Sequence, residues 1–373
     1  MLEKQSKRNF GLDIIRSLAI IMVLICHFML FDKNSSAFIK QFSFLFGIYG
    51  VELFFVLSGF LIGRILINLY YSENYISRIK TFYLRRWFRT LPLYYLVLII
   101  SFIILIFSEP NTNIFSPFYL KYIFFIQNFD LRFYQFFPQS WSLSIEEWFY
   151  LLMPVVLLFF YVKKIRPENL YRKLLILILL ITAARFCYVI FFNPALDPGI
   201  RNFIPLRLDA ILTGVVFACI KTNNKIIYEK FLTKNISIMN FALLMIITCC
   251  LYYSITHPIT SLSVQLLKIF SWNIISFSFG LLIVFFEHNA FINEILPKIP
   301  FIKTIFEKTS LYSYSMYLFQ GMILIYLINH TGLFNRGNYL FFSILLSTAI
   351  IYIVSAFTYK YIEKPIMKVR DKF

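Results

Sequence analysis

Apolar stretches long enough to cross a lipid bilayer recur ten times along this chain of 373 residues. A hydrocarbon layer of about 30 Å requires roughly 20 apolar residues in a helix. The expected spans are 12–31, 43–69, 88–108, 141–162, 174–193, 203–220, 237–256, 264–286, 310–330 and 339–360. A shorter apolar stretch, 118–129, is expected to form a partial or interfacial helix that does not cross. The chain is therefore predicted to be all-α, a polytopic membrane helix bundle of about ten transmembrane helices.

The composition excludes a water-soluble fold. Hydrophobic residues make up 60% of the chain and charged residues 14%, whereas soluble domains average about 25% charged residues. Because the loops are short, we expect residues 1–373 to form a single integral-membrane domain with no separate soluble domain. The five cysteines lie inside apolar stretches without the spacing of a zinc site, so we expect neither a metal nor structural disulfides.

Positive charge is distributed unevenly between the loops on the two sides of the expected bundle. Of the 36 Lys and Arg, twenty-five fall on the side of the two termini, six on the other side and five within spans. Cytoplasmic loops of membrane proteins carry an excess of Lys and Arg, so both termini are predicted to be cytoplasmic. Topology and contact with anionic membrane lipid then explain the net charge of +18. A nucleic-acid partner is not expected.

The first span carries three ionisable residues, Asp13, Arg16 and His27. Such residues are costly in hydrocarbon and commonly mark a functional site or a buried pair. Eleven helical steps of about 100° separate Arg16 from His27, so both side chains leave the same face, roughly 16 Å apart along the axis. Asp13 lies three residues before Arg16 and is expected to pair with it. The alternative is that Arg16 extends to the inner interface while His27 is an ordinary packed histidine.

A basic cluster stands at the predicted cytoplasmic start of the third span, where Arg85, Arg86 and Arg89 precede Pro92. The i,i+3 spacing places Arg86 and Arg89 on one face of a helix. Two guanidinium groups arranged in this way suit the binding of phosphate. The alternative interpretation is a positively charged anchor at the membrane surface, which would explain the cluster but not its spacing.

Two adjacent carboxylates, Glu146 and Glu147, enter the fourth span within the segment Trp141–Tyr150. We expect one of them to face the interior of the bundle, where it would orient a histidine, and the other to remain at the wet boundary. The alternative is an aromatic belt with interfacial acids.

Residues in the second and sixth spans indicate how helices pack. Ser58 and Gly59 in the second span are small and permit two helices to approach closely. In the sixth span Arg207 and Asp209 are two residues apart and face different ways. We therefore expect each of them to pair with another helix and to have a structural role.

Taken in order, these segments resemble the acyltransferase-3 family of integral-membrane O-acyltransferases. The first-helix motif of that family is matched by Leu12-Asp13, Arg16, ten intervening residues and His27. The other matching segments are Gly50–Ile62, Arg86-x-x-Arg89 with Pro92, Trp141–Tyr150, Pro205–Gly214, Ser313–Leu318 and Glu363-Lys364-Pro365. Family members often carry a histidine after the stretch matched by Ser313–Leu318, whereas Gln320 stands at about that position here. Because glutamine cannot accept a proton, we assign no catalytic role to this position.

The resemblance implies a membrane enzyme that transfers an acyl group to a hydroxyl. The expected donor is acyl-CoA, with acetyl-CoA the simplest case, and no metal is expected to take part. The expected acceptor is a cell-surface or lipid-linked carbohydrate. The enzyme is expected in the cytoplasmic membrane, in contact with membrane lipid.

Acyl transfer from a thioester to an alcohol needs a base for the hydroxyl, stabilisation of the developing oxyanion and binding of the acyl donor. On this hypothesis His27 is the general base, while Arg86 and Arg89 hold the phosphates of CoA. Arg85 is assigned to the same phosphate-binding group, and Arg16, positioned by Asp13, is expected to guide the donor. Glu146 is expected to orient His27. The residues expected at the acceptor site are Trp141, Tyr150 and Ser58. Direct attack by the hydroxyl is the simplest route, with a transient acyl-histidine as the alternative.

Two other functions fit part of the pattern. A non-enzymatic transporter or flippase of lipid-linked sugars would have a similar number of helices and similar buried charges. An acyltransferase acting on a lipid or another small molecule would share the same motifs. The outer loops would choose between these acceptors, and they contain no recognisable motif.

Overall fold

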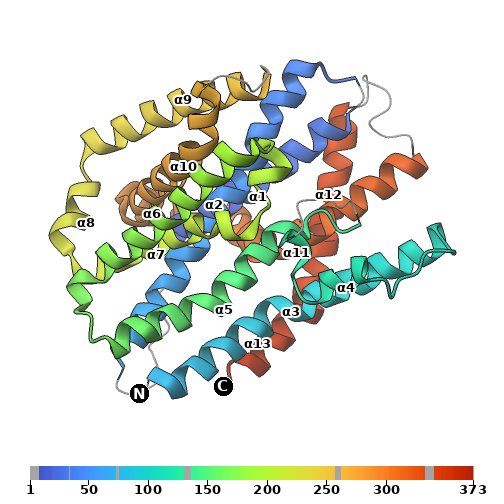
Figure 1. The fold of residues 1–373 in the computed structure, drawn as a ribbon. Helices are drawn as coiled ribbons and strands as arrows, with labels where there is room; N and C mark the ends of the chain where they lie inside the picture. The colour runs from blue at the N-terminus through green and yellow to red at the C-terminus, as the bar shows by residue number, and fades with distance from the viewer. Residues whose placement is uncertain are drawn as a thin grey trace.

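The structure, a computed structural model, consists of helices and connecting segments, with no strand in the part of the chain that it describes (Figure 1). It describes residues 8–32, 34–72, 75–129, 136–256, 262–331 and 340–372. Nine helices within these ranges are long and apolar enough to cross a membrane. They are α1 (Phe10–Phe31), α2 (Ala37–Tyr70), α3 (Tyr75–Ser108), α5 (Ser140–Val162), α6 (Pro167–Phe192), α9 (Lys234–Thr256), α10 (Leu262–His288), α11 (Pro300–Thr331) and α12 (Leu340–Thr358). The prediction of an all-α, multi-pass membrane bundle is confirmed.

The expected sixth span, 203–220, is not one long helix. It is divided at Arg207 into η3 (Ile204–Leu206) and α7 (Leu208–Asn223). α7 has only 16 residues, and every residue from Asp209 to Ile220 is buried. Hydropathy alone predicts a full span here because a helix surrounded by other helices is as apolar as one surrounded by lipid.

α7 packs against α2 so closely that the contact requires glycine on both helices. A Cβ atom added at Gly59 would lie 1.8 Å from the carbonyl oxygen of Ile211, and one added at Gly214 would lie 2.0 Å from that of Val56. No larger side chain fits at either position. The expectation that Gly59 permits close helix packing is therefore confirmed.

Several helices begin before their apolar cores. α3 starts at Tyr75 rather than at 88, and α11 starts at Pro300 rather than at 310. The added turns contain charged residues such as Arg78 and Lys303, which lower the hydropathy but are good helix formers. The stretch 118–129 forms the short segments α4 (Pro117–Ile123) and η1 (Gln127–Phe129), as expected. The remaining short elements are η2 (Leu196–Ile200), α8 (Lys225–Phe231), η4 (Phe291–Ile295), η5 (Leu296–Lys298), η7 (Tyr359–Glu363) and α13 (Lys364–Arg370).

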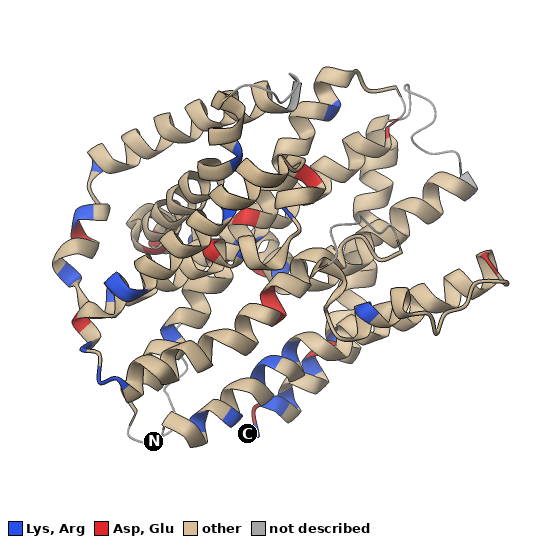
Figure 2. Ribbon diagram, viewed as in Figure 1, with Lys and Arg blue, Asp and Glu red and all other residues tan. Residues whose placement is uncertain are grey.

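The start of α1 lies at the same end of the bundle as the C-terminal elements. Arg8 donates a hydrogen bond to the carbonyl oxygen of Glu307 in α11 at 2.9 Å and lies near Tyr359 in η7. α13 packs against α3, and Figure 2 shows Lys and Arg gathered along these two helices. That this end faces the cytoplasm stays a prediction from the distribution of charge.

Candidate functional site

α1 places His27 in the wall of a cavity of about 210 Å³. The ring nitrogen Nδ1 of His27 lies 2.8 Å from the carbonyl oxygen of Val23, one turn earlier on the same helix. A carbonyl oxygen only accepts hydrogen bonds, so this contact assigns the proton to Nδ1. In the neutral imidazole the other nitrogen, Nε2, then carries a lone pair. Such a ring is in the correct form to accept a proton from a molecule in the cavity.

The cavity is built from helices that are far apart in sequence. Besides α1, its wall includes residues of α2, α5, α11 and the segment around η2. The lining side chains that matter for chemistry are Phe44, Trp141, Asp197, Arg201, Asn202, Tyr317 and Gln320. Aromatic faces therefore alternate with a few polar groups, as is typical of small-molecule sites. The structure thus brings Trp141, assigned from the sequence to the acceptor site, into the same cavity as His27.

Arg201 is the cavity residue that sequence reasoning missed. Its guanidinium carbon lies 4.6 Å from the centre of the Trp141 ring and 5.5 Å from that of Phe44. It also forms an ion pair with Asp197 at 3.1 Å, one helical turn earlier. In the sequence Arg201 counts only as one of six basic residues on the outer side. Nothing in the sequence shows that its loop folds back over the cavity.

The polar groups of the cavity are incompletely paired. Oδ1 of Asp197 and Oδ1 of Asn202 are buried without a hydrogen bond to any described residue. Both amide atoms of Gln320 also lack a hydrogen bond of normal geometry to any described residue, and this side chain lies within hydrogen-bond reach of the His27 ring. Buried polar atoms are nearly always hydrogen-bonded. These atoms therefore mark places where a ligand that offers hydrogen bonds would fit.

A second group of functional candidates lies at the other end of α1. Arg16 is close enough to Arg86 and Arg89 to interact electrostatically with both, and Glu146 is within range of all three guanidinium groups. Three guanidinium groups therefore lie together with the Glu146 carboxylate, while Glu147 is within electrostatic range of Arg86 and Glu363 of Arg89. Guanidinium groups gathered in this way suit the binding of a phosphate anion. Arg85 is exposed and none of its contacts places it in this cluster.

Tyr150 and Ser58 belong to the arginine cluster rather than to the cavity of His27. The hydroxyl of Tyr150 donates to a carboxylate oxygen of Glu146 at 3.1 Å and is 2.6 Å from the hydroxyl of Ser58. The guanidinium carbon of Arg86 lies 5.9 Å from the centre of the Tyr150 ring. Their contacts thus place Tyr150 and Ser58 beside the arginines, and neither lines the cavity of His27. Their assignment to the acceptor site stays a prediction.

The expectation that Glu146 orients His27 is corrected. Glu146 bonds to Tyr150, while the His27 ring is held by the backbone of its own helix. Tyr317 lines the cavity of His27 and is the cavity residue that lies near Glu146. Its hydroxyl lies 2.6 Å from that of Ser142, and it is within electrostatic range of both Arg201 and Glu146.

Asp13 lies within electrostatic range of Arg16, but its hydrogen bonds go to other residues and not to Arg16 as expected. Its carboxylate accepts hydrogen bonds from Arg8 at 2.5 and 2.9 Å and from the hydroxyl of Ser310 at 2.7 Å. Partial burial by itself would lower the pKa of Arg8, but the hydrogen bond and the charge of Asp13 raise it above its ordinary value. Arg8 and Ser310 thus occupy the carboxylate, which ties the start of α1 to α11 and leaves Arg16 directed toward α3.

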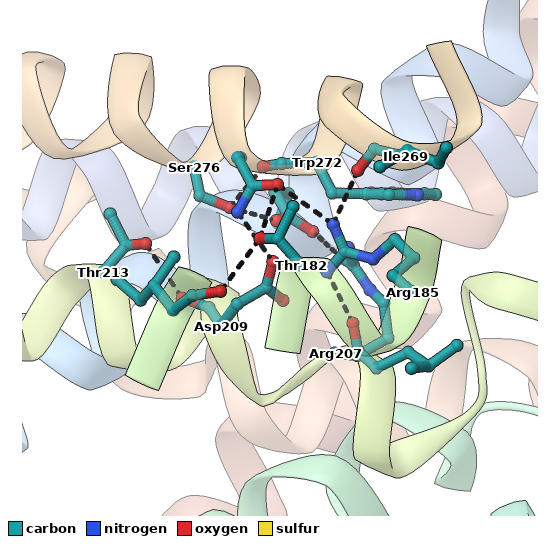
Figure 3. Close-up of polar contacts among 12 residues, drawn as sticks. Thr182, Arg185, Arg207, Asp209, Thr213, Ile269, Trp272 and Ser276 are labelled. Carbon is teal, nitrogen blue, oxygen red and sulfur yellow. Dashed lines mark hydrogen bonds and ion pairs between the residues drawn. The ribbon is translucent and has the colours of Figure 1, made fainter. Parts of the chain in front are cut away.

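A separate network of buried charges joins α2, α6, α7 and α10 (Figure 3). Arg185 forms an ion pair with Asp209, and Arg207 forms one with Glu52. The guanidinium carbon of Arg207 also lies 3.8 Å from the centre of the Trp272 ring. The expectation that Arg207 and Asp209 pair with other helices and not with each other is confirmed.

We expect Asp209→Ala to destabilise the protein strongly. Arg185 is completely buried, and removing its carboxylate partner leaves an uncompensated charge, a change that costs about 3–5 kcal/mol. The unfolding midpoint of the detergent-purified protein should fall accordingly. Glu229→Ala, which removes an exposed carboxylate on α8, is the matched control and should have little effect. Equal midpoints for the two variants would contradict a structural role for this network.

Comparison of the sequence with known proteins identifies a matching family and several relatives. A family model described as an acyltransferase domain matches residues 9–358. The peptidoglycan O-acetyltransferase OatA of Listeria monocytogenes is 31% identical over 229 residues, which cover 58% of this chain and 34% of the relative. The O-acetyltransferase OatA of Staphylococcus aureus is 31% identical over 222 residues, which cover 56% of this chain and 34% of the relative.

A third relative aligns with nearly the whole chain. The putative peptidoglycan O-acetyltransferase YrhL of Bacillus subtilis is 25% identical over 374 residues, which cover 95% of this chain and 54% of the relative. The chain therefore spans between a third and about half of the length of these relatives. No solved structure matches it.

Proposed function

Because the chain belongs to the acyltransferase-3 family, we propose that it is an O-acyltransferase of the cytoplasmic membrane. In this proposal it moves an acyl group, acetyl in the simplest case, from cytoplasmic acyl-CoA to a hydroxyl of a cell-envelope carbohydrate. The observation that carries the proposal is the unbroken helix α1. One end of this helix brings Arg16 to a cluster of guanidinium groups, and His27 lies eleven residues further along in the wall of a cavity.

The arginine cluster is proposed to hold the donor. CoA carries several phosphate groups, and guanidinium groups bind phosphate through charge-assisted hydrogen bonds. Arg86 is partly buried and Arg89 is exposed, so together they offer an anion both a solvent-facing and an interior contact. The pantetheine arm of CoA is a thin, extended chain. It would run along α1 from Arg16 to His27, a distance of roughly 16 Å by helical rise.

His27 is proposed to act as the general base in a direct transfer. Its Nε2 takes the proton of the acceptor hydroxyl while the oxygen attacks the carbonyl carbon of the thioester. A C–O bond forms, and the carbonyl oxygen becomes an oxyanion. Collapse of this intermediate breaks the C–S bond, and the departing CoA thiolate receives the proton from His27. The products are an ester of the acceptor and free CoA, with His27 returned to its starting form.

The cavity suits a carbohydrate acceptor. Trp141, Phe44 and Tyr317 offer apolar faces, while the unpaired oxygens of Asp197 and Asn202 accept hydrogen bonds from hydroxyl groups. Two of the relatives are named for peptidoglycan. Peptidoglycan or its lipid-linked precursor is therefore our proposed acceptor.

Binding of free CoA tests whether the protein is an enzyme of this class. CoA at about 100 times its Kd should stabilise the detergent-purified protein by about 2.7 kcal/mol and raise its unfolding midpoint. Adenosine, which lacks the phosphates and the pantetheine arm, should leave the midpoint unchanged. An unchanged midpoint with CoA would instead favour a transporter or flippase of lipid-linked sugars, which has no reason to bind a cytoplasmic thiol cofactor.

A further inference from the structure

Gln320 on α11 is a buried amide without a hydrogen bond of normal geometry. Its side chain is 1% exposed, and neither Nε2 nor Oε1 makes a hydrogen bond of normal geometry to any described residue, although the amide is within hydrogen-bond reach of the His27 ring. The other glutamine of the cavity wall differs in this respect. Gln139 donates from Nε2 to the carbonyl oxygen of Leu318 at 2.8 Å. Gln320 is therefore available for a ligand, whereas the amide of Gln139 holds two segments of the protein together.

The position of Gln320 points to the reaction centre. It lines the same cavity as His27 and lies within interaction range of that ring. Tyr317, almost one helical turn earlier on α11, faces the same cavity, but its hydroxyl is already paired with Ser142 at 2.6 Å. Arg201 also lines the cavity and lies within electrostatic range of His27, with one N–H of its guanidinium group bonded to Asp197 and its face against the Trp141 ring. Gln320 is thus a hydrogen-bond donor beside the proposed base, and the His27 ring is the polar group within hydrogen-bond reach of its amide.

One requirement of the proposed reaction has no residue assigned to it. The carbonyl oxygen of the thioester gains negative charge as the hydroxyl attacks, and enzymes stabilise this charge with preorganised hydrogen-bond donors. The arginine cluster lies near the other end of α1, where it is assigned to the CoA phosphates. A donor close to His27 is needed, because the attacked carbonyl must lie near the hydroxyl from which His27 takes its proton.

We propose that Nε2 of Gln320 donates a hydrogen bond to the carbonyl oxygen of the acyl thioester and stabilises the oxyanion of the tetrahedral intermediate. This inference rests on the proposed acyl transfer. No covalent bond to Gln320 forms or breaks, and its amide keeps both protons throughout. Glutamine cannot accept a proton, and a catalytic role as a base is therefore not expected at this position. Stabilising an oxyanion requires a donor, and a neutral amide provides one at any physiological pH.

Gln320→Met is the decisive variant because it removes both polar atoms at nearly constant volume. We expect kcat for acetyl transfer to fall about 10²- to 10³-fold, as when one oxyanion donor is removed from other enzymes. KM for acetyl-CoA and for a soluble peptidoglycan fragment should stay within about threefold, since the bond strengthens mainly in the transition state. The unfolding midpoint should be unchanged or higher, because an unpaired buried amide gives way to an apolar side chain.

Two further variants make the test specific. Gln320→His restores an N–H donor and should recover at least about tenfold in kcat over Gln320→Met. Ser347→Ala removes another buried polar group without a hydrogen bond, on α12 and outside the cavity wall. It should keep wild-type kcat, with an unfolding midpoint that is unchanged or higher.

Different results of these measurements would overturn the oxyanion role of Gln320 and the proposed acyltransferase function. If the wild type transfers acetyl and Gln320→Met does so within about threefold of its kcat, the oxyanion role is overturned while the acyltransferase function stands. A rise in KM alone would also overturn it, because Gln320 would then act in ground-state binding. A lower unfolding midpoint for Gln320→Met would show that the amide has a structural partner. If the wild type transfers nothing, the proposed function fails and the inference fails with it.

Discussion

Replacing His27 with alanine should lower kcat for acyl transfer by about 10²- to 10⁴-fold, the usual contribution of a general base. The ring is bonded to the protein through Nδ1 and the carbonyl oxygen of Val23. This bond lies within one turn of a helix that is otherwise intact, so its loss should leave the fold unchanged. The measurement is ester formation on a peptidoglycan fragment by the purified protein, followed by mass spectrometry of the product.

His288→Ala provides the matched control for this prediction. His288 ends α10 and lies against Tyr228 on α8, at a centroid distance of 5.2 Å. It does not line the cavity, so its removal should leave kcat within about threefold of the wild type. Retained transfer by a well-folded His27→Ala protein would remove His27 from the mechanism.

The double substitution Arg86→Gln and Arg89→Gln should weaken the binding of CoA by about 10- to 100-fold. A hydrogen bond to a charged group contributes about 1.5–3 kcal/mol. We take the lower part of that range because Arg89 is exposed and its charge is screened by water. The Kd for CoA can be measured by titration calorimetry on the detergent-purified protein. KM for the acceptor should change much less, since the acceptor binds at the cavity of His27.

Removal of two positive charges elsewhere controls for a general electrostatic effect. Lys163 and Lys164 follow the end of α5 and are exposed. Replacing both with glutamine makes the same change in net charge without touching the arginine cluster. If that variant loses as much CoA affinity as the arginine variant, the arginines act only through the overall charge of this face. If neither variant loses affinity, the arginines anchor the protein in the membrane and do not hold the donor.

The sequence predicts most of the long spans well and the short buried helix α7 and the charged helix ends less well. Length and hydropathy place α1, α5 and α10 within a few residues of their observed bounds. The same criterion overestimates α7, because a short helix buried among helices is as apolar as a membrane span. It also misses the charged first turns of α3, since hydropathy does not measure helix propensity.

The relative placement of site residues was predictable from the sequence only where the residues lie on the same helix. The spacing of Arg16 and His27 on α1 follows from helical geometry alone. Contacts that depend on tertiary packing cannot be derived from the geometry of one helix. The bonds of Asp13 to Arg8 and Ser310, and of Glu146 to Tyr150, were therefore not predicted. Arg201 lay outside any motif because its position depends on how the segment after α6 turns back over the cavity.

Vectorial transfer in proteoliposomes tests the central claim most directly, namely that donor and acceptor enter from opposite ends of α1. Vesicles would hold a soluble peptidoglycan fragment inside, and acetyl-CoA with a labelled acetyl group would be added outside. Protein molecules whose arginine cluster faces outward should then place the label on the enclosed fragment, and His27→Ala vesicles should not. If the enclosed fragment stays unlabelled while wild-type protein in detergent acetylates it, the two substrates do not meet across the membrane and the account is contradicted.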